Sequence, residues 1–107
     1  MYTYEKRRRN LIRLLYYRRF DTCENLAREL EVTVQTIYTD IAALTYSYPL
    51  EVTRGRNGGV RLADEFIRDH KVLRSEQAEL IDSIRSQLKG RELFVFDSIF
   101  SQFDLYD

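Results

Sequence analysis

The clearest apolar pattern in the chain runs through the stretch ENLARELEVTVQTIYTDIAAL, residues 24–44. Apolar residues recur there at helical spacing in two short blocks, Leu26, Ala27 and Leu30 followed by Ile37, Ile41 and Leu44. Thr22 and Thr33 stand just before the two blocks, and threonine is a favoured residue for capping a helix N-terminus. The pattern therefore predicts two short helices joined by a tight turn.

The second of these helices presents a polar surface near its N-terminus. The side chains expected to point outward there are short polar, methyl-bearing or aromatic groups: Thr33, Val34, Gln35, Thr36, Tyr38 and Thr39. Two short helices joined by a tight turn form a helix-turn-helix, whose second helix enters the major groove and meets base edges near its N-terminus. We therefore expect this helix to read double-stranded DNA, with these six residues at the interface.

A basic hairpin is expected after the second helix. In LEVTRGRNGGVRL, residues 50–62, apolar and polar residues alternate on both sides of Asn57-Gly58, a dipeptide typical of tight hairpin turns. A basic hairpin that follows a recognition helix forms a winged helix, and its wing can reach phosphates or an adjacent minor groove. The candidate wing contacts are Arg54, Arg56, Asn57 and Arg61. The alternative is a hairpin that only closes the core.

Residues 4–18 are predicted to form a first helix, with Leu11, Leu14 and Leu15 facing inward. Four cations, residues 6–9, lie near its N-terminus, where the helix dipole disfavours positive charge. A bound phosphate would relieve that cost, so Arg7 and Arg8 are candidate DNA contacts. A solvated basic face is an equally good interpretation.

Residues 8–62 resemble the N-terminal winged helix-turn-helix of DeoR-type and WYL-domain bacterial transcription regulators. The resemblance rests on LARELEVTVQTIYTDIAAL for the two helices and RGRNGGVRL for the wing, and it implies a three-helix core, a two-stranded wing and sequence-specific DNA binding. The family's turn usually carries glycine where Glu31 stands, so Glu31 must accept a strained backbone or the turn is rearranged. The family usually has Arg just before its Asp, whereas Tyr38-Thr39 precedes Asp40 here, so the target sequence does not carry over.

The remaining residues, 64–107, are predicted to form a helical extension to a winged-helix domain of residues 1–63. We expect a short amphipathic stretch over 64–70, a helix capped by Ser75 and ended by Gly90, and a final helix through RELFVFDSIFSQFDLY. SEQAELIDSI resembles the linker helix of WYL regulators, but their sensory domain does not follow. The fold class is thus mainly α with a small β-hairpin.

The final helix carries more apolar surface than one exposed helix face accommodates. It either folds back on its own chain or pairs with a second copy. We favour a homodimer because an operator-binding protein gains affinity and spacing selectivity from twofold symmetry. The expected interface residues are Leu93, Phe96, Ile99, Phe100 and Phe103.

The charge of the chain is balanced overall but divided unevenly along it. Among the 107 residues, 17 Lys and Arg balance 17 Asp and Glu, yet residues 1–61 hold 11 cations against 7 anions. This asymmetry supports a basic DNA-facing front and a more acidic back.

The single cysteine, Cys23, excludes an internal disulfide and suits a protein of a reducing compartment. We expect Cys23 to be a small buried side chain rather than a redox switch. No apolar stretch is long enough to span a bilayer, so we expect a soluble, cytoplasmic protein.

These features predict a DNA-binding transcriptional regulator, in particular a repressor that occupies a palindromic operator as a homodimer. The alternative is a winged-helix adaptor that binds a protein partner through its hydrophobic C-terminal helix. An enzyme is not expected, because the chain has no paired nucleophile and base and no phosphate-cradling loop. His70 lacks a companion Cys or His at ligand spacing, so neither a metal nor another cofactor is predicted.

Overall fold

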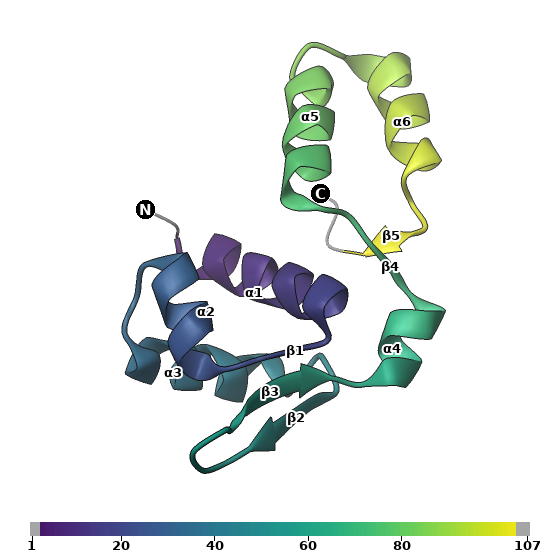
Figure 1. Cartoon of the computed structure of the whole chain (residues 1–107). Helices are drawn as coiled ribbons and strands as arrows, with labels where there is room; N and C mark the ends of the chain where they lie inside the picture. Colours follow the sequence, from purple (N-terminus) through teal and green to yellow (C-terminus); the bar gives the residue numbers. More distant parts are fainter. Residues whose placement is uncertain (1–2, 105–107) are drawn as a thin grey trace. The chain divides into compact units, whose positions relative to one another are not determined.

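Within residues 3–69, three helices enclose an apolar core (Figure 1). The computed structural model describes residues 3–104, which divide into two compact units, the first ending at Asp69 and the second beginning at His70. The three helices around this core are α1 (Tyr4–Arg18), α2 (Cys23–Leu30) and α3 (Val34–Leu44). The core contains buried apolar side chains from the three helices and from one strand of the sheet: Leu11, Ile12, Leu15, Leu26, Ala27, Leu30, Ile37, Ile41, Val60 and Leu62. Leu14, expected to face inward, is only half-buried, and Ile12 takes the buried position instead.

Both predicted N-caps of the helix-turn-helix are confirmed. The Thr22 hydroxyl accepts a hydrogen bond from the Asn25 N–H, and the Thr33 hydroxyl accepts one from the Thr36 N–H, each at 3.2 Å. Between the two helices, Glu31 adopts the left-handed conformation with φ 58° and ψ 46°. The turn therefore keeps the sharp geometry that glycine normally provides, and Glu31 bears the strain.

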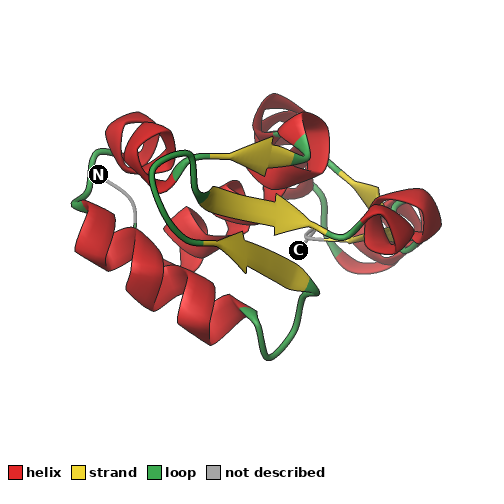
Figure 2. Cartoon of the chain, turned by 60° about the horizontal axis from the view of Figure 1, so that its bottom comes forward, coloured by secondary structure: helices red, strands yellow, loops and turns green. Residues whose placement is uncertain are grey.

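A small antiparallel sheet completes the first unit. Its strands are β1 (Phe20–Asp21), β2 (Leu50–Thr53) and β3 (Gly59–Leu62), in the order β1–β3–β2 (Figure 2). The β2–β3 hairpin is confirmed, but Asn57-Gly58 does not form a two-residue turn between its strands. Residues 54–58 link the strands, the left-handed residue is Gly55, and the Gly58 N–H donates to the Gly55 carbonyl at 3.0 Å.

Helix α4 (Asp64–Asp69) ends the first unit, and a helical hairpin dominates the second. Helices α5 (Ser75–Arg85) and α6 (Gly90–Ile99) follow β4 (Lys71–Val72) and precede β5 (Phe103–Asp104). The two short strands pair in parallel. The small core of this unit consists of Leu73, Ala78 and Ile81, with Phe96, Phe100 and Phe103 packed against them. Among the described residues, no helix is long and apolar enough to cross a membrane.

The helix boundaries in the second unit differ from the prediction. Helix α5 stops at Arg85, and Gly90, expected to end it, instead begins α6 with a φ of 57°. The final helix ends at Ile99, where the sequence predicts continuation as far as Tyr106, which lies outside the described residues. The chain turns at Phe100, because the reversal packs Phe103 on the same core that Phe96 and Phe100 cover.

The strained turn yields a stability prediction. Glu31→Gly should raise the free energy of unfolding by about 1 kcal/mol, because glycine adopts left-handed backbone without the steric clash of a Cβ atom. Urea denaturation measures the change. Glu31→Ala is the matched control, since it removes the same exposed side chain but retains the clash. Equal stability of the two variants would contradict this account of the turn.

Candidate nucleic-acid interface

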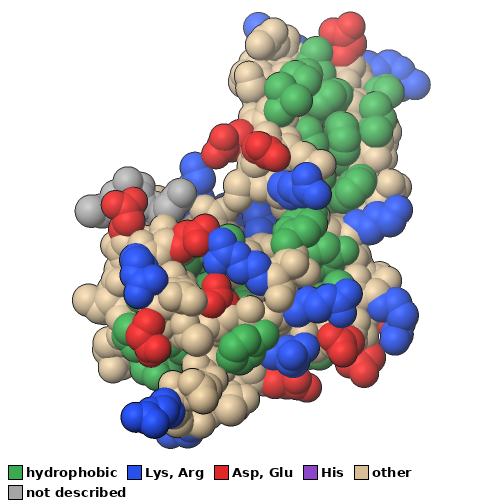
Figure 3. Space-filling view, viewed as in Figure 1, with side chains coloured by type: hydrophobic (Ala, Val, Ile, Leu, Met, Phe, Trp, Pro, Cys, Tyr) green, Lys and Arg blue, Asp and Glu red, His purple; other side chains and the backbone are tan. Residues whose placement is uncertain are grey.

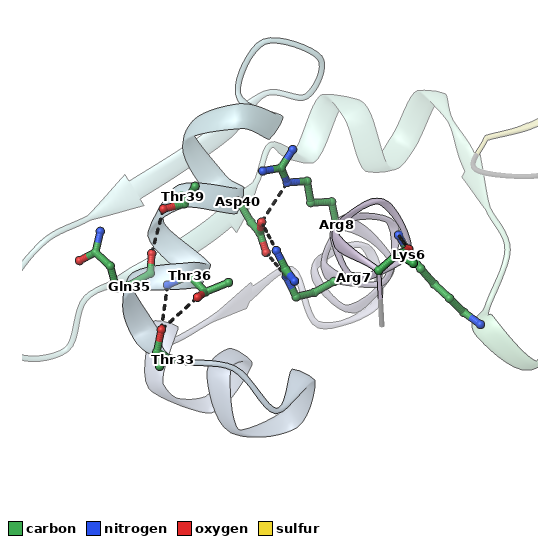
Figure 4. Close-up of polar contacts among 9 residues, drawn as sticks. Lys6, Arg7, Arg8, Thr33, Gln35, Thr36, Thr39 and Asp40 are labelled. Atoms are coloured by element: carbon green, nitrogen blue, oxygen red, sulfur yellow. Dashed lines mark hydrogen bonds and ion pairs between the residues drawn. The ribbon is translucent and has the colours of Figure 1, made fainter. Parts of the chain in front are cut away.

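The N-terminal half of α3 exposes part of the predicted reading surface. Gln35, Tyr38 and Thr39 are exposed, whereas Val34 and Thr36 are half-buried. The Thr36 and Thr33 hydroxyl oxygens lie 3.0 Å apart, and the Thr39 hydroxyl donates to the Gln35 carbonyl. The Gln35 side chain points away from α1 (Figure 4). Its amide is therefore placed to hydrogen-bond a molecule lying against α3.

A groove of about 640 Å³ lies between α3, the β2–β3 hairpin and the first turn of α2. It brings together three of the predicted contact residues, Gln35, Tyr38 and Arg54. Tyr38 and Val52, each close to half exposed, supply apolar surface within it. The other lining residues are Cys23, Glu24, Ile41, Ala42, Thr45, Thr53, Gly55, Gly58 and Gly59. The groove can therefore hold a chain that is apolar along part of its length and negatively charged near Arg54.

The wing loop presents Arg54, Arg56 and Asn57 on its surface, all of them exposed. Its path depends on Gly58, because a Cβ atom there would collide with the Thr53 carbonyl oxygen. Arg61 is also exposed but belongs to β3, and its guanidinium lies 3.8 Å from Asp64. The structure thus gathers the loop residues at one end of the hairpin and engages Arg61 with α4.

The two predicted contacts from α1 form an internal ion-pair cluster with Asp40 of α3 (Figure 4). The Arg7 guanidinium donates to both Asp40 oxygens, at 2.6 and 2.9 Å, and Arg8 Nε donates to Oδ1 at 2.9 Å. The Asp40 carboxylate is completely buried, and only 14% of the Arg7 side chain is exposed. Arg8 also lies over the ring of Tyr4, 4.9 Å from its centre. The cluster ties the start of α1 to the middle of α3.

The electrostatics of the cluster follow from this geometry. Burial alone would raise the pKa of the Asp40 carboxyl, but the hydrogen bonds and charges of Arg7 and Arg8 outweigh it and lower the pKa below its ordinary value. The hydrogen bond to Asp40 correspondingly raises the pKa of Arg7. The carboxylate therefore stays charged at neutral pH and attracts both guanidinium groups.

Sequence reasoning missed the pairing of Asp40 with α1, although the chain carries a signal for it. Asp40 lies three residues after Ile37 and one before Ile41, on the buried stripe of α3. A carboxylate in that position needs a cation, because burying an unpaired charge is costly. The basic run at the start of α1 supplies it. The contribution of Cys23 and Glu24 to the groove carries no such local signal, because it depends on how the hairpin folds beside α2.

Comparison with known proteins gives one match. The family described as HTH domain matches residues 7–61, a span that contains α2, α3, the groove, the wing and the Asp40 cluster. The search of curated proteins and the search of solved structures each found no match.

Removal of the Asp40 charge should destabilise the first unit. Asp40→Asn is expected to lower the free energy of unfolding by about 3 kcal/mol at neutral pH, because it leaves the buried Arg7 guanidinium without a counter-charge. Chemical denaturation measures the loss. Asp69→Asn is the matched control, since the Asp69 side chain is 61% exposed in its pair with Arg68, and its loss should be below about 0.5 kcal/mol.

The same cluster predicts a pH dependence. The lowered pKa of Asp40 means that its stabilisation is complete above the unfolded-state pKa of about 4 and disappears as pH falls through the lower folded-state pKa. The stability difference between the natural chain and Asp40→Asn should therefore shrink in acid. Denaturation curves recorded from neutral to strongly acidic pH test this, and a constant difference would contradict it.

Proposed function

Because the chain belongs to the HTH domain family, a family of DNA-binding domains, we propose that it is a sequence-specific transcriptional repressor. It binds a palindromic operator as a homodimer in the cytoplasm and acts by occupying the site. The observation that carries this proposal is the shared groove, in which α3 and the wing place Gln35, Tyr38 and Arg54 on one concave surface.

Helix α3 is the reading element in this proposal. The major groove of DNA admits an α-helix, and a glutamine side chain can form paired hydrogen bonds with adenine N6 and N7. Exposed Gln35 on α3 has the position and chemistry for that contact. Arg7 and Arg8 act indirectly, by holding Asp40 and with it the orientation of α3. A rigidly held helix loses less conformational entropy when it binds.

The wing and the groove contact the DNA backbone in this proposal. A sugar–phosphate strand alternates apolar sugar faces with charged phosphates, which matches a groove lined by Tyr38, Val52 and Arg54. Arg56 extends the cationic surface along the wing loop. Such contacts position the protein without reading sequence, so specificity comes from α3.

The experiment that tests the proposal is selection of bound duplexes from a random DNA pool with the full chain at physiological salt. Enrichment of an inverted repeat, with half-sites separated by whole helical turns, is expected of a symmetric operator-binding protein. Weak binding without any enriched sequence would overturn the proposal and favour a protein-binding adaptor. Specific binding by a homodimer and its loss in α3 variants would together support repression by occupancy.

Gln35 should contribute to sequence discrimination. Gln35→Ala is expected to weaken binding to the selected operator by about 1–3 kcal/mol and to leave binding to random duplex nearly unchanged, because it removes a base contact only. Fluorescence anisotropy with both duplexes measures the two affinities. Gln102→Ala, which changes an exposed glutamine of the second unit, is the matched control. Equal losses on both duplexes would exclude a reading role for Gln35.

Arg56 should contribute to binding of every sequence. Arg56→Ala is expected to weaken specific and random binding alike and to reduce the slope of log K against log salt by about 0.9 for each phosphate that the wing no longer neutralises. Titrations at several salt concentrations measure this slope. Arg91→Ala removes an exposed arginine from the second unit and should leave the slope unchanged. An unaltered slope in Arg56→Ala would mean that the wing only closes the core.

A further inference from the structure

The exposed surface of α3 carries no charge. The one charged side chain within Val34–Leu44 is Asp40, which is completely buried against Arg7 and Arg8. The exposed residues of the helix are Gln35, Tyr38, Thr39 and Ala42. They follow one another at spacings of three, one and three positions, so they lie on one side of the helix. We call these four residues the α3 face.

Neighbouring cations belong to other elements. Arg7 and Arg8 are bound to Asp40, and Lys6 extends away from α3 (Figure 4). Across the groove, Arg54 and Arg56 lie in the wing loop, and Figure 3 shows Lys and Arg side chains at the tip of the β2–β3 hairpin. The α3 face itself therefore offers a partner no guanidinium or ammonium group.

The threonine hydroxyl on the α3 face is engaged within the helix. Thr39 Oγ1 donates to the Gln35 carbonyl at 3.2 Å, and just beyond the face Thr45 Oγ1 donates to the Ala42 carbonyl at 2.7 Å. A hydroxyl proton held by the helix backbone is not available to a base. The polar groups left on the face are the Gln35 amide and the Tyr38 hydroxyl, and the rest of it is methyl and ring surface.

This combination of groups matches one kind of base pair. In the major groove, guanine is read chiefly by Arg or Lys and cytosine by Asp or Glu, and α3 exposes none of these. Adenine is matched by a glutamine amide, and the thymine C5-methyl group is matched by alanine, by the threonine methyl group and by aromatic rings. The α3 face therefore has the groups that favour A·T pairs and lacks those that favour G·C pairs.

We propose that the α3 face reads a short run of A·T pairs, with Gln35 on an adenine and Thr39 and Ala42 on thymine methyl groups. The helix rises about 10 Å between Gln35 and Ala42. That length corresponds to about three steps of about 3.4 Å along a DNA strand. The inference rests on the proposed function and extends the single base contact of Gln35 to a class of operator whose half-sites have an A·T core.

Selection of duplexes from a random pool tests the base composition of this core. Positions whose preference is lost when Gln35→Ala or Thr39→Ser is selected in parallel mark the segment beneath α3, and that segment should consist of A·T pairs. G·C pairs at those positions would overturn this inference and leave the proposed function standing. A pool without any enriched sequence would instead reject the proposed function, and the inference with it.

Replacement of thymine by uracil tests the methyl contacts one at a time. Uracil keeps the base pairing and removes the C5-methyl group, so at least one such change in the segment should weaken binding about fourfold. Uracil outside both half-sites is the matched control and should leave the affinity unchanged. The proposal is overturned if uracil has no effect anywhere in the segment.

Thr39→Ser locates the protein side of this contact. The variant loses the threonine methyl group and retains the hydroxyl that donates to the Gln35 carbonyl. At the thymine that Thr39 contacts, the effect of uracil should disappear in Thr39→Ser, because the two changes remove the two halves of one interaction. An undiminished effect at every thymine would contradict the role assigned to Thr39.

Addition of a cation to the α3 face should change the base that is read. Thr39→Arg places a guanidinium there, and selection with this variant should enrich guanine at a position where the natural chain selects A·T. Ser98→Arg adds the same charge to an exposed position of α6 and should leave the selected segment unchanged. An unaltered A·T segment with Thr39→Arg would show that the lack of cations does not set the preference, and would overturn the proposal.

Discussion

The orientation of α3 depends on the buried ion pairs between Asp40 and the first turns of α1. A charged carboxylate in an apolar interface is tolerated only with close cationic partners, so α1 and α3 cannot slide or rotate freely against each other. Asp40 faces α1, which directs Gln35 away from α1 and turns Tyr38 toward the groove. One internal contact thereby determines which side of α3 is presented to a partner.

Much of the first unit could be predicted because its signals are local. Helix caps depend on residues three positions apart, so Thr22 and Thr33 could be identified before any tertiary contact was known. The hairpin could be predicted from the alternation of apolar and polar residues on both sides of a glycine-rich stretch. The position of its turn could not be predicted, because it depends on which residues of the two strands pair. That register is set by the packing of Val60 and Leu62.

The second unit was harder to predict because its sequence specifies apolar surface without specifying what covers it. The spacing of Phe96 and Phe100 is compatible with an interface and with an internal core, and the structure uses both in the core. The parallel pairing of β4 with β5 joins residues about thirty positions apart through two-residue strands, which are too short to show a period of two. The Asp40 pairing likewise spans distant residues, although a buried carboxylate hints at it.

The distribution of charge on the folded chain bears on how the proposed binding to DNA would work. Several cations of the basic N-terminal half are engaged internally: Arg7 and Arg8 with Asp40, Arg18 with Asp21 and Glu29, and Arg19 and Arg61 with Asp64. Beside the groove and wing, Arg54 and Arg56 are exposed, while Glu24 adds a negative charge to the lining. If each of these two arginines contacts one phosphate, as proposed, the salt slope is only about −2. Electrostatic attraction is then weak for a single copy, so the proposed operator complex would depend on base contacts that two joined copies repeat over two half-sites.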